Sequence, residues 1–87
     1  MHAIHYLDFS CRKSETAIVK ECSKIADREG DYKGQITHIR FKDIVLGDRG
    51  EAEEWLDTND SGWYDNIAIK YKDGRKMMWL VKIEYHC

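Results

Sequence analysis

Proline is absent from this sequence of 87 residues, and cysteine is scarce, with three residues at positions 11, 22 and 87. An odd number of cysteines without a Cys-x-x-Cys pair is unsuited to a disulfide framework or a zinc ribbon. No stretch has the length and apolarity needed to cross a bilayer, and the first residues, MHAIHYLDF, lack the basic region and apolar run of a signal peptide. We therefore expect a cytoplasmic protein without membrane contact.

Recognisable catalytic patterns are also missing. The sequence contains no Gly-rich phosphate loop and no ordered set of nucleophile, histidine and acid. Cys11 stands beside Arg12 and Lys13, which can lower the pKa of a thiol, but no general base accompanies it. A single domain spanning residues 1–87 buries only about 60–65% of its unfolded surface, which leaves little room for a deep active site. We expect neither an enzyme nor a cofactor.

The spacing of apolar residues along the chain predicts strands and helices in turn. His2 to Cys11 predicts a strand with apolar residues on both sides, which suits the centre of a sheet. Ser14 is an expected helix N-cap and Gly30 an expected helix end, so the apolar spacing between them predicts an amphipathic helix over about Glu15 to Glu29.

The middle of the chain predicts a strand and a shorter helix. Gln35 to Lys42 alternates as a half-exposed strand, and the apolar run Ile44 to Leu46 breaks that phase and is interpreted as a connection. Asp48 and Glu51 have the spacing of an N-terminal capping pair. The helix that they begin runs into the segment DTNDSGWYD, residues 57–65.

The C-terminal third predicts a β-hairpin around Asp73-Gly74. A three-residue loop with Gly74 in the left-handed conformation pairs odd-numbered residues with odd-numbered residues, which places the two main apolar sets on one face. The element order strand, helix, strand, helix, strand, strand predicts the α+β class. We expect a four-stranded, mainly antiparallel sheet with both helices on one face.

Acidic residues are concentrated in the middle of the chain. Residues 43–65 carry eight carboxylates and one base, for a net charge of −7, whereas residues 1–42 sum to +2 and residues 66–87 to +3. An acidic helix face next to aromatic residues can attract and anchor a basic partner. The expected partner-binding residues are Glu51, Glu53, Glu54, Asp57, Asp60, Trp63, Tyr64 and Asp65. The alternative is a solubilising helix face, with Trp63 packed over the end of the sheet.

The segment DTNDSGWYD also suggests calcium. Oxygen-bearing residues fall at positions 1, 3, 5 and 9 of a calcium-loop template: Asp57, Asn59, Ser61 and Asp65. Position 12, which normally supplies a bidentate Glu, is Ala68, and a strand follows instead of a helix, so an EF-hand is excluded. We predict no metal site, although a looser set of Asp57, Asn59, Asp60 and Asp65 remains an alternative.

Direct nucleic-acid binding is not expected. Basic side chains cluster at Lys70 to Lys76 and at Arg40 with Lys42, but a pI near 6 and the acidic middle segment oppose a phosphate backbone. A small-ligand or nucleotide-binding module that uses the basic sheet face and acts as a homodimer remains an alternative, so the chain is expected to be a monomer or a homodimer.

Three segments resemble small uncharacterised prophage proteins of Firmicutes. These are Arg40-Phe41, within an "IRF" strand, Glu51 to Trp55, within an "EEAEE" helix, and Gly62 to Tyr71, which is similar to a "GWYDxxAVKY" strand entry. By class, the chain looks like an anti-CRISPR or other anti-defence inhibitor. The resemblance implies a phage-derived protein that binds a basic host defence protein, such as a CRISPR effector, in the host cytoplasm.

Overall fold

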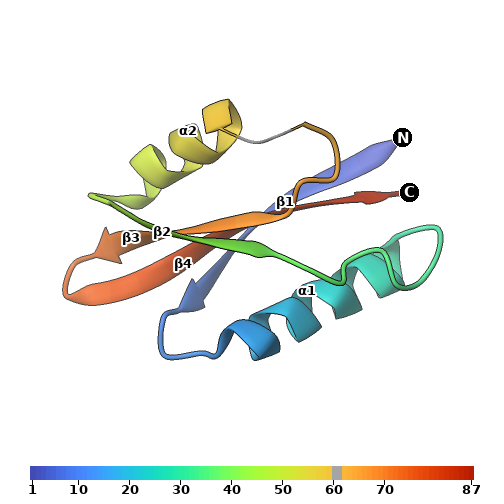
Figure 1. Ribbon diagram of the computed structural model, residues 1–87, viewed down its shortest axis with the longest axis horizontal. Coiled ribbons are helices and arrows are strands. Elements are labelled where there is room, and N and C mark those ends of the chain that lie inside the picture. The colour runs from blue at the N-terminus through green and yellow to red at the C-terminus, as the bar shows by residue number, and fades with distance from the viewer. Residues whose placement is uncertain (60–61) are drawn as a thin grey trace.

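The computed structural model describes residues 1–59 and 62–87, which form a mixed four-stranded sheet and two helices (Figure 1). The strand order is β1-β4-β3-β2, in which β4 is antiparallel to both neighbours and β2 is parallel to β3. The α+β class and the expected element order are therefore confirmed. The elements are β1 (His2–Ser10), α1 (Glu15–Glu29), β2 (Arg40–Leu46), α2 (Arg49–Asn59), β3 (Ile67–Asp73) and β4 (Lys76–His86).

Helix α1 begins and ends where its sequence predicts. The Ser14 side chain accepts a hydrogen bond from the Ala17 amide at 3.1 Å, and Gly30 donates its amide to the Ala26 carbonyl at 2.8 Å. Ile18 and Cys22, one helical turn apart, are fully buried along with Ala26. Local capping and a single apolar stripe are thus sufficient to define this helix.

The two helices cover opposite faces of the sheet, so the expectation that both lie on one face is wrong. Ile18 of α1 packs in a cluster with odd-numbered β4 residues such as Val81, whereas Leu56 of α2 packs with the even-numbered Leu80. Successive side chains of a strand point to opposite faces. Figure 1 shows the same arrangement, with α2 above the sheet and α1 below it.

Strand β4, and not β1, occupies a central position. Its residues 79–85 are all buried, because helices and loops cover both of its faces. β1 is an edge strand that pairs only with β4 among the described strands, from His2 opposite His86 to Ser10 opposite Met78. The apolar residues on both sides of β1 reflect cover by α1 on one face and contact with the α2 cluster on the other.

The hairpin register also differs from the expectation. Ile69 pairs with Leu80, and Asp73 pairs with Lys76 across a two-residue turn, so odd-numbered residues face even-numbered ones. Gly74 adopts φ +62°, which suits the first central position of a type II′ turn. The expected odd-to-odd pairing assumed one apolar face, whereas the two-sided core buries both sets.

The strand expected over residues 35–42 begins later and runs further. Ile36 and Ile39 are buried against the α1 cluster but precede β2, and the run Ile44 to Leu46 belongs to the strand. The pairing of β2 with β3 shifts between Phe41 and Val45, which explains why the alternation breaks at this point.

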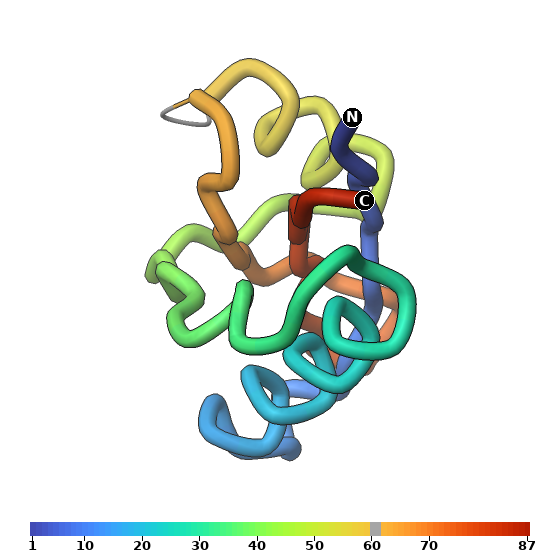
Figure 2. The backbone as a smooth tube through the Cα atoms, turned by 90° about the vertical axis from the view of Figure 1, so that its right-hand side faces the viewer, coloured from blue at the N-terminus to red at the C-terminus, as the bar shows by residue number. Residues whose placement is uncertain are grey.

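The two termini lie side by side (Figures 1 and 2), because β1 and β4 are antiparallel neighbours and the Cys87 amide donates to the Met1 carbonyl at 3.1 Å. No helix within residues 1–59 and 62–87 is long and apolar enough to span a membrane.

We predict that Leu56→Ala destabilises the protein by about 2–5 kcal/mol, because the side chain is fully buried between α2 and the sheet. Urea denaturation followed by tryptophan fluorescence measures the change. The control is Val45→Ala, at a side chain that is 46% exposed, for which we expect less than about 1 kcal/mol. Equal losses in the two variants would contradict the packing of α2 described here.

Candidate functional site

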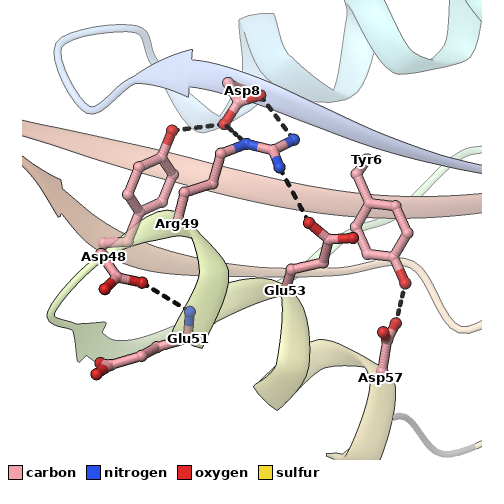
Figure 3. A network of polar contacts seen from close by, with 8 residues as sticks. Tyr6, Asp8, Asp48, Arg49, Glu51, Glu53 and Asp57 are labelled. Carbon is pink, nitrogen blue, oxygen red and sulfur yellow. Dashed lines mark hydrogen bonds and ion pairs between the residues drawn. The ribbon is translucent and has the colours of Figure 1, made fainter.

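The N-terminus of α2 is fixed by the predicted capping pair (Figure 3). Asp48 accepts a hydrogen bond from the Glu51 amide through its Oδ1 atom at 2.8 Å, and Glu51 accepts one from the Gly47 amide through its Oε2 atom at 3.0 Å. The first interaction occupies an amide donor that the helix start leaves unsatisfied, and the second ties the residue before the N-cap to the first turn of the helix. Glu51 therefore stabilises the start of α2, although its side chain is exposed.

The acidic residues of α2 divide between two flanks of the helix. Ala52 and Leu56 face the sheet and are fully buried. At 100° per residue, positions 49, 53 and 57 lie on one side of this buried stripe, and positions 51, 54 and 58 lie on the other. We call these the inner flank, which faces β1, and the outer flank. The expected single acidic face therefore consists of two surfaces with different surroundings.

Ion pairs on the inner flank connect α2 to β1 (Figure 3). The Arg49 guanidinium donates to both carboxylate oxygens of Asp8, at 2.9 and 3.1 Å, and to Glu53 at 3.0 Å. Tyr71 of β3 donates its hydroxyl to the same Asp8 at 2.5 Å. Arg49 is shared between Asp8 and Glu53, so the Glu53 carboxylate is only partly compensated but is engaged within the chain.

Asp57, also on the inner flank, is engaged within the chain as well. Its Oδ1 atom accepts a hydrogen bond from the Tyr6 hydroxyl and lies 3.7 Å from the Lys82 ammonium. The Lys82 side chain is only 8% exposed, and its ammonium also lies 5.8 Å from the centroid of the Tyr6 ring. A buried cation requires such partners, so Asp57 stabilises the fold.

These contacts shift the ionisation of the groups that make them. Burial and the hydrogen bond to Asp57 raise the pKa of Tyr6 to about 12, and burial and the hydrogen bond to Asp8 raise that of Tyr71 to about 12. Partial burial acts to raise the pKa of Asp8, but the hydrogen bonds from Arg49 and Tyr71 outweigh it and hold this pKa below its ordinary value.

The outer flank of α2 presents a shallow groove towards β2. Its volume is about 240 Å³, and it is lined by Leu46, Glu51, Glu54, Trp55 and Thr58. Glu54 is exposed, and its carboxylate makes no hydrogen bond or ion pair with any described residue. The indole of Trp55, which is partly buried against the α2 cluster, forms the apolar part of the groove. A basic side chain fits this combination of carboxylate and aromatic ring.

A second exposed feature lies where the chain approaches β3, and we call it the aromatic corner: His2, Trp63 and Tyr64. The ring of Trp63 stacks on His2 with a centroid distance of 4.5 Å, yet Trp63 remains 76% exposed. Tyr64 has φ +60° and is the only non-glycine residue among those described with a positive φ. Trp63 therefore contacts the sheet end with one face and leaves most of its surface available.

Glu84 holds the aromatic corner in place. This β4 carboxylate is 8% exposed, and its Oε1 atom lies 2.9 Å from both the Tyr64 amide and His2 Nδ1. A buried carboxylate with backbone and imidazole partners can compensate for an unfavourable backbone conformation. Neither Glu84 nor His2 is among the partner-binding residues expected from the sequence, although an acidic residue inside an otherwise apolar strand marks Glu84.

Asp65 follows the aromatic corner directly but is paired within the chain. Its carboxylate receives two hydrogen bonds from Arg40, at 3.0 and 2.6 Å, and its side chain is 13% exposed. Of the eight expected partner-binding residues, Glu51 and Glu54 line the groove, and Trp63 and Tyr64 form part of the aromatic corner. Three others, Glu53, Asp57 and Asp65, form ion pairs within the chain. The eighth, Asp60, lies outside the described residues.

The looser calcium set is not assembled by the described residues. Asp57 and Asp65 are each occupied by a cation of the chain itself, Lys82 and Arg40 respectively. Asn59 donates its side-chain amide to the Trp55 carbonyl at 2.9 Å. Within residues 1–59 and 62–87, no group of three or more histidine, cysteine, aspartate or glutamate side chains is placed to hold a metal ion.

Comparison of the chain with protein-family models, with curated proteins and with solved structures finds no match. The function is therefore argued from the geometry of the groove on α2 and of the aromatic corner.

We predict that Asp8→Asn costs about 1 kcal/mol at pH 7, a value that allows for solvent screening of this partly exposed pair. Because the folded-state pKa of Asp8 is lowered, its contribution is present above the unfolded pKa of about 3.9 and is lost as the pH falls through the folded value. Urea unfolding between pH 7 and strongly acidic pH should show the wild-type and variant stabilities converging.

The matched control is Asp43→Asn. The Asp43 side chain is 96% exposed and lies 3.7 Å from Lys70, so its removal should change stability by less than about 0.5 kcal/mol. A stability difference for Asp8→Asn that stays constant down to the lowest pH would contradict the role given to the Asp8–Arg49 pair.

Proposed function

We propose that this protein is a non-enzymatic binding protein whose outer α2 flank and aromatic corner attach to a basic surface of a host protein. The proposed partner handles nucleic acid, as a CRISPR effector does, and the proposed role is that of a phage-encoded anti-defence inhibitor. The observation that carries the binding surface is the exposed Glu54 carboxylate beside Trp55 in the α2 groove. The resemblance to prophage proteins supports the phage origin.

The distribution of charge partners favours this surface over the rest of the acidic segment. Glu53 and Asp57 are already paired with cations of the chain, so a partner would have to break those contacts to use them. Glu54 has no such contact to lose, and desolvating an unpaired carboxylate against a partner's guanidinium or ammonium group gives a charge-assisted hydrogen bond.

The aromatic corner supplies the apolar part of the proposed interface. Trp63, 76% exposed, stacks on His2, and the backbone of Tyr64, 44% exposed, is held by Glu84, so part of the conformational freedom of the aromatic corner is already lost before binding. Large aromatic side chains are enriched among residues that dominate binding energy. Both the corner and the groove lie on the α2 side of the sheet, and an interface of standard size, about 800 Å² on each partner, can include both.

The test is capture of the partner from host lysate, followed by a measured affinity. We predict that Glu54→Lys and Trp63→Ala each weaken binding by about tenfold or more, because one reverses the unpaired charge and the other removes the exposed anchor. An oligonucleotide that binds the isolated partner should compete with this protein, as expected for occupation of a basic nucleic-acid channel.

Glu15→Lys is the matched control for charge. It makes the same change in net charge at an exposed residue in the first turn of α1, on the other face of the sheet, at a cost of at most about 1 kcal/mol from the helix dipole. Binding that is equally weakened by Glu15→Lys would indicate a response to net charge alone. Binding that survives both Glu54→Lys and Trp63→Ala would refute the proposed surface.

A further inference from the structure

A larger cavity lies at the opposite end of the β1–β4 ladder from the aromatic corner. It is about 590 Å³ in volume and is formed where β1 enters the loop before α1 and where the β3–β4 hairpin turns. It is lined by Ser10, Cys11, Arg12, Arg75, Lys76, Met77 and Met78. This volume falls within the range of about 300–1,000 Å³ that is typical of small-molecule sites.

Backbone hydrogen bonds fix the walls of this cavity. The Cys11 amide donates to the Met77 carbonyl at 3.1 Å and extends the contact between β1 and β4 by one residue. Ser10 then holds the departing loop, because its side-chain oxygen accepts a hydrogen bond from the Arg12 amide at 3.1 Å. On the other side, the tight turn at Gly74 brings Arg75 next to the first residues of β4. The basic residues therefore approach the cavity from two separate segments.

Among the described residues, the lining contains three cations and no carboxylate. Arg12, Arg75 and Lys76 are exposed, and none of them forms an ion pair with another described residue. Neither of the nearest acids along the strands lines the cavity. Asp8 is paired with Arg49, and Asp73 is exposed at the hairpin turn, opposite Lys76. In a chain of net charge −2, this is a local excess of positive charge, which attracts anions.

The remaining lining is apolar and polarisable. Met77 is 37% exposed, whereas Met78, the next residue of β4, points to the opposite face and is partly buried against the α2 cluster. Burial raises the pKa of the Cys11 thiol, with a smaller opposing effect of Lys70, so this group adds no negative charge near neutral pH. Burial thus outweighs the cations near Cys11 and keeps the pKa of its thiol above the ordinary value. Thioether sulfur makes favourable contacts with aromatic rings.

We infer that this cavity binds a small phosphate-bearing ligand with a planar aromatic group, of which a mononucleotide is the simplest example. The guanidinium groups of Arg12 and Arg75 provide paired donors for phosphate oxygens, and the Lys76 ammonium adds a third cation. The exposed Met77 side chain offers an apolar, polarisable contact for the aromatic base. This inference is independent of the surface proposed for protein binding, which lies at the other end and on the α2 flank.

The experiment is a titration of the ¹⁵N-labelled full chain, followed by its amide resonances. The probes are adenosine 5′-monophosphate, inorganic phosphate and adenosine. We expect adenosine 5′-monophosphate to shift the resonances of residues 10–12 and 75–78, inorganic phosphate to shift the same set more weakly, and adenosine to give the smallest effect. Absence of localised shifts at millimolar adenosine 5′-monophosphate would overturn the inference.

Arg12→Ala and Arg75→Ala should each raise the dissociation constant for adenosine 5′-monophosphate by about tenfold, as expected for loss of a charged hydrogen bond. Lys33→Ala is the matched control, because it removes an exposed cation from the loop after α1, at the end of the sheet where Asp31 contacts His86. Unchanged spectra away from the cavity would show that each variant is folded.

Two outcomes would contradict the small-ligand site. An equal loss of affinity in Lys33→Ala would show that phosphate responds to overall charge and not to this cavity. A single-stranded oligonucleotide that binds far more tightly than the mononucleotide, with shifts spreading along Lys70 and Lys72, would assign the basic end to nucleic acid instead. Glu54→Lys should leave mononucleotide binding intact, which separates this result from the test of protein binding.

Discussion

The burial of β4 on both faces is the constraint on which the rest of the structure depends. Residues 79–85 are buried without interruption, and alternate side chains join the α1 cluster and the α2 cluster. Such a strand needs a layer on each side, because apolar area exposed on either face would cost about 25 cal/mol per Å². The helices are therefore separated by the sheet.

This arrangement decides what the acidic segment can do. The face of the sheet beneath α2 contains two nearly buried charges, Lys82 and Glu84, and each recruits partners from outside its strand. Asp57 forms an ion pair with Lys82, while Glu84 accepts a hydrogen bond from the Tyr64 amide and contacts His2. Acidic residues on the inner flank thus stabilise the attachment of α2, whereas the Glu54 carboxylate on the outer flank forms no ion pair within residues 1–59 and 62–87. The proposed protein-binding surface is the part of the acidic segment that the fold does not use.

The two ends of the β1–β4 ladder have opposite character. At one end, Trp63 stacks on His2 above a buried carboxylate, and at the other, Arg12 and Arg75 line a cavity without any acid. Antiparallel pairing places residues that are distant in sequence at the same end, which is how Ser10 comes to lie beside Met78. A chain with a small net charge can therefore present two separate sites suited to partners of opposite charge.

The sequence by itself determined the local elements. Ser14 and Gly30 delimit α1, Asp48 and Glu51 cap α2, and the alternation around Gly74 marks a hairpin, because each of these signals acts within a few residues. Only the tertiary structure decided which face each helix covers, which strand is central, and which of Glu53, Glu54 and Asp57 are paired. Those outcomes depend on contacts between distant residues, such as Arg49 with Asp8, and no local pattern encodes the competition among possible partners.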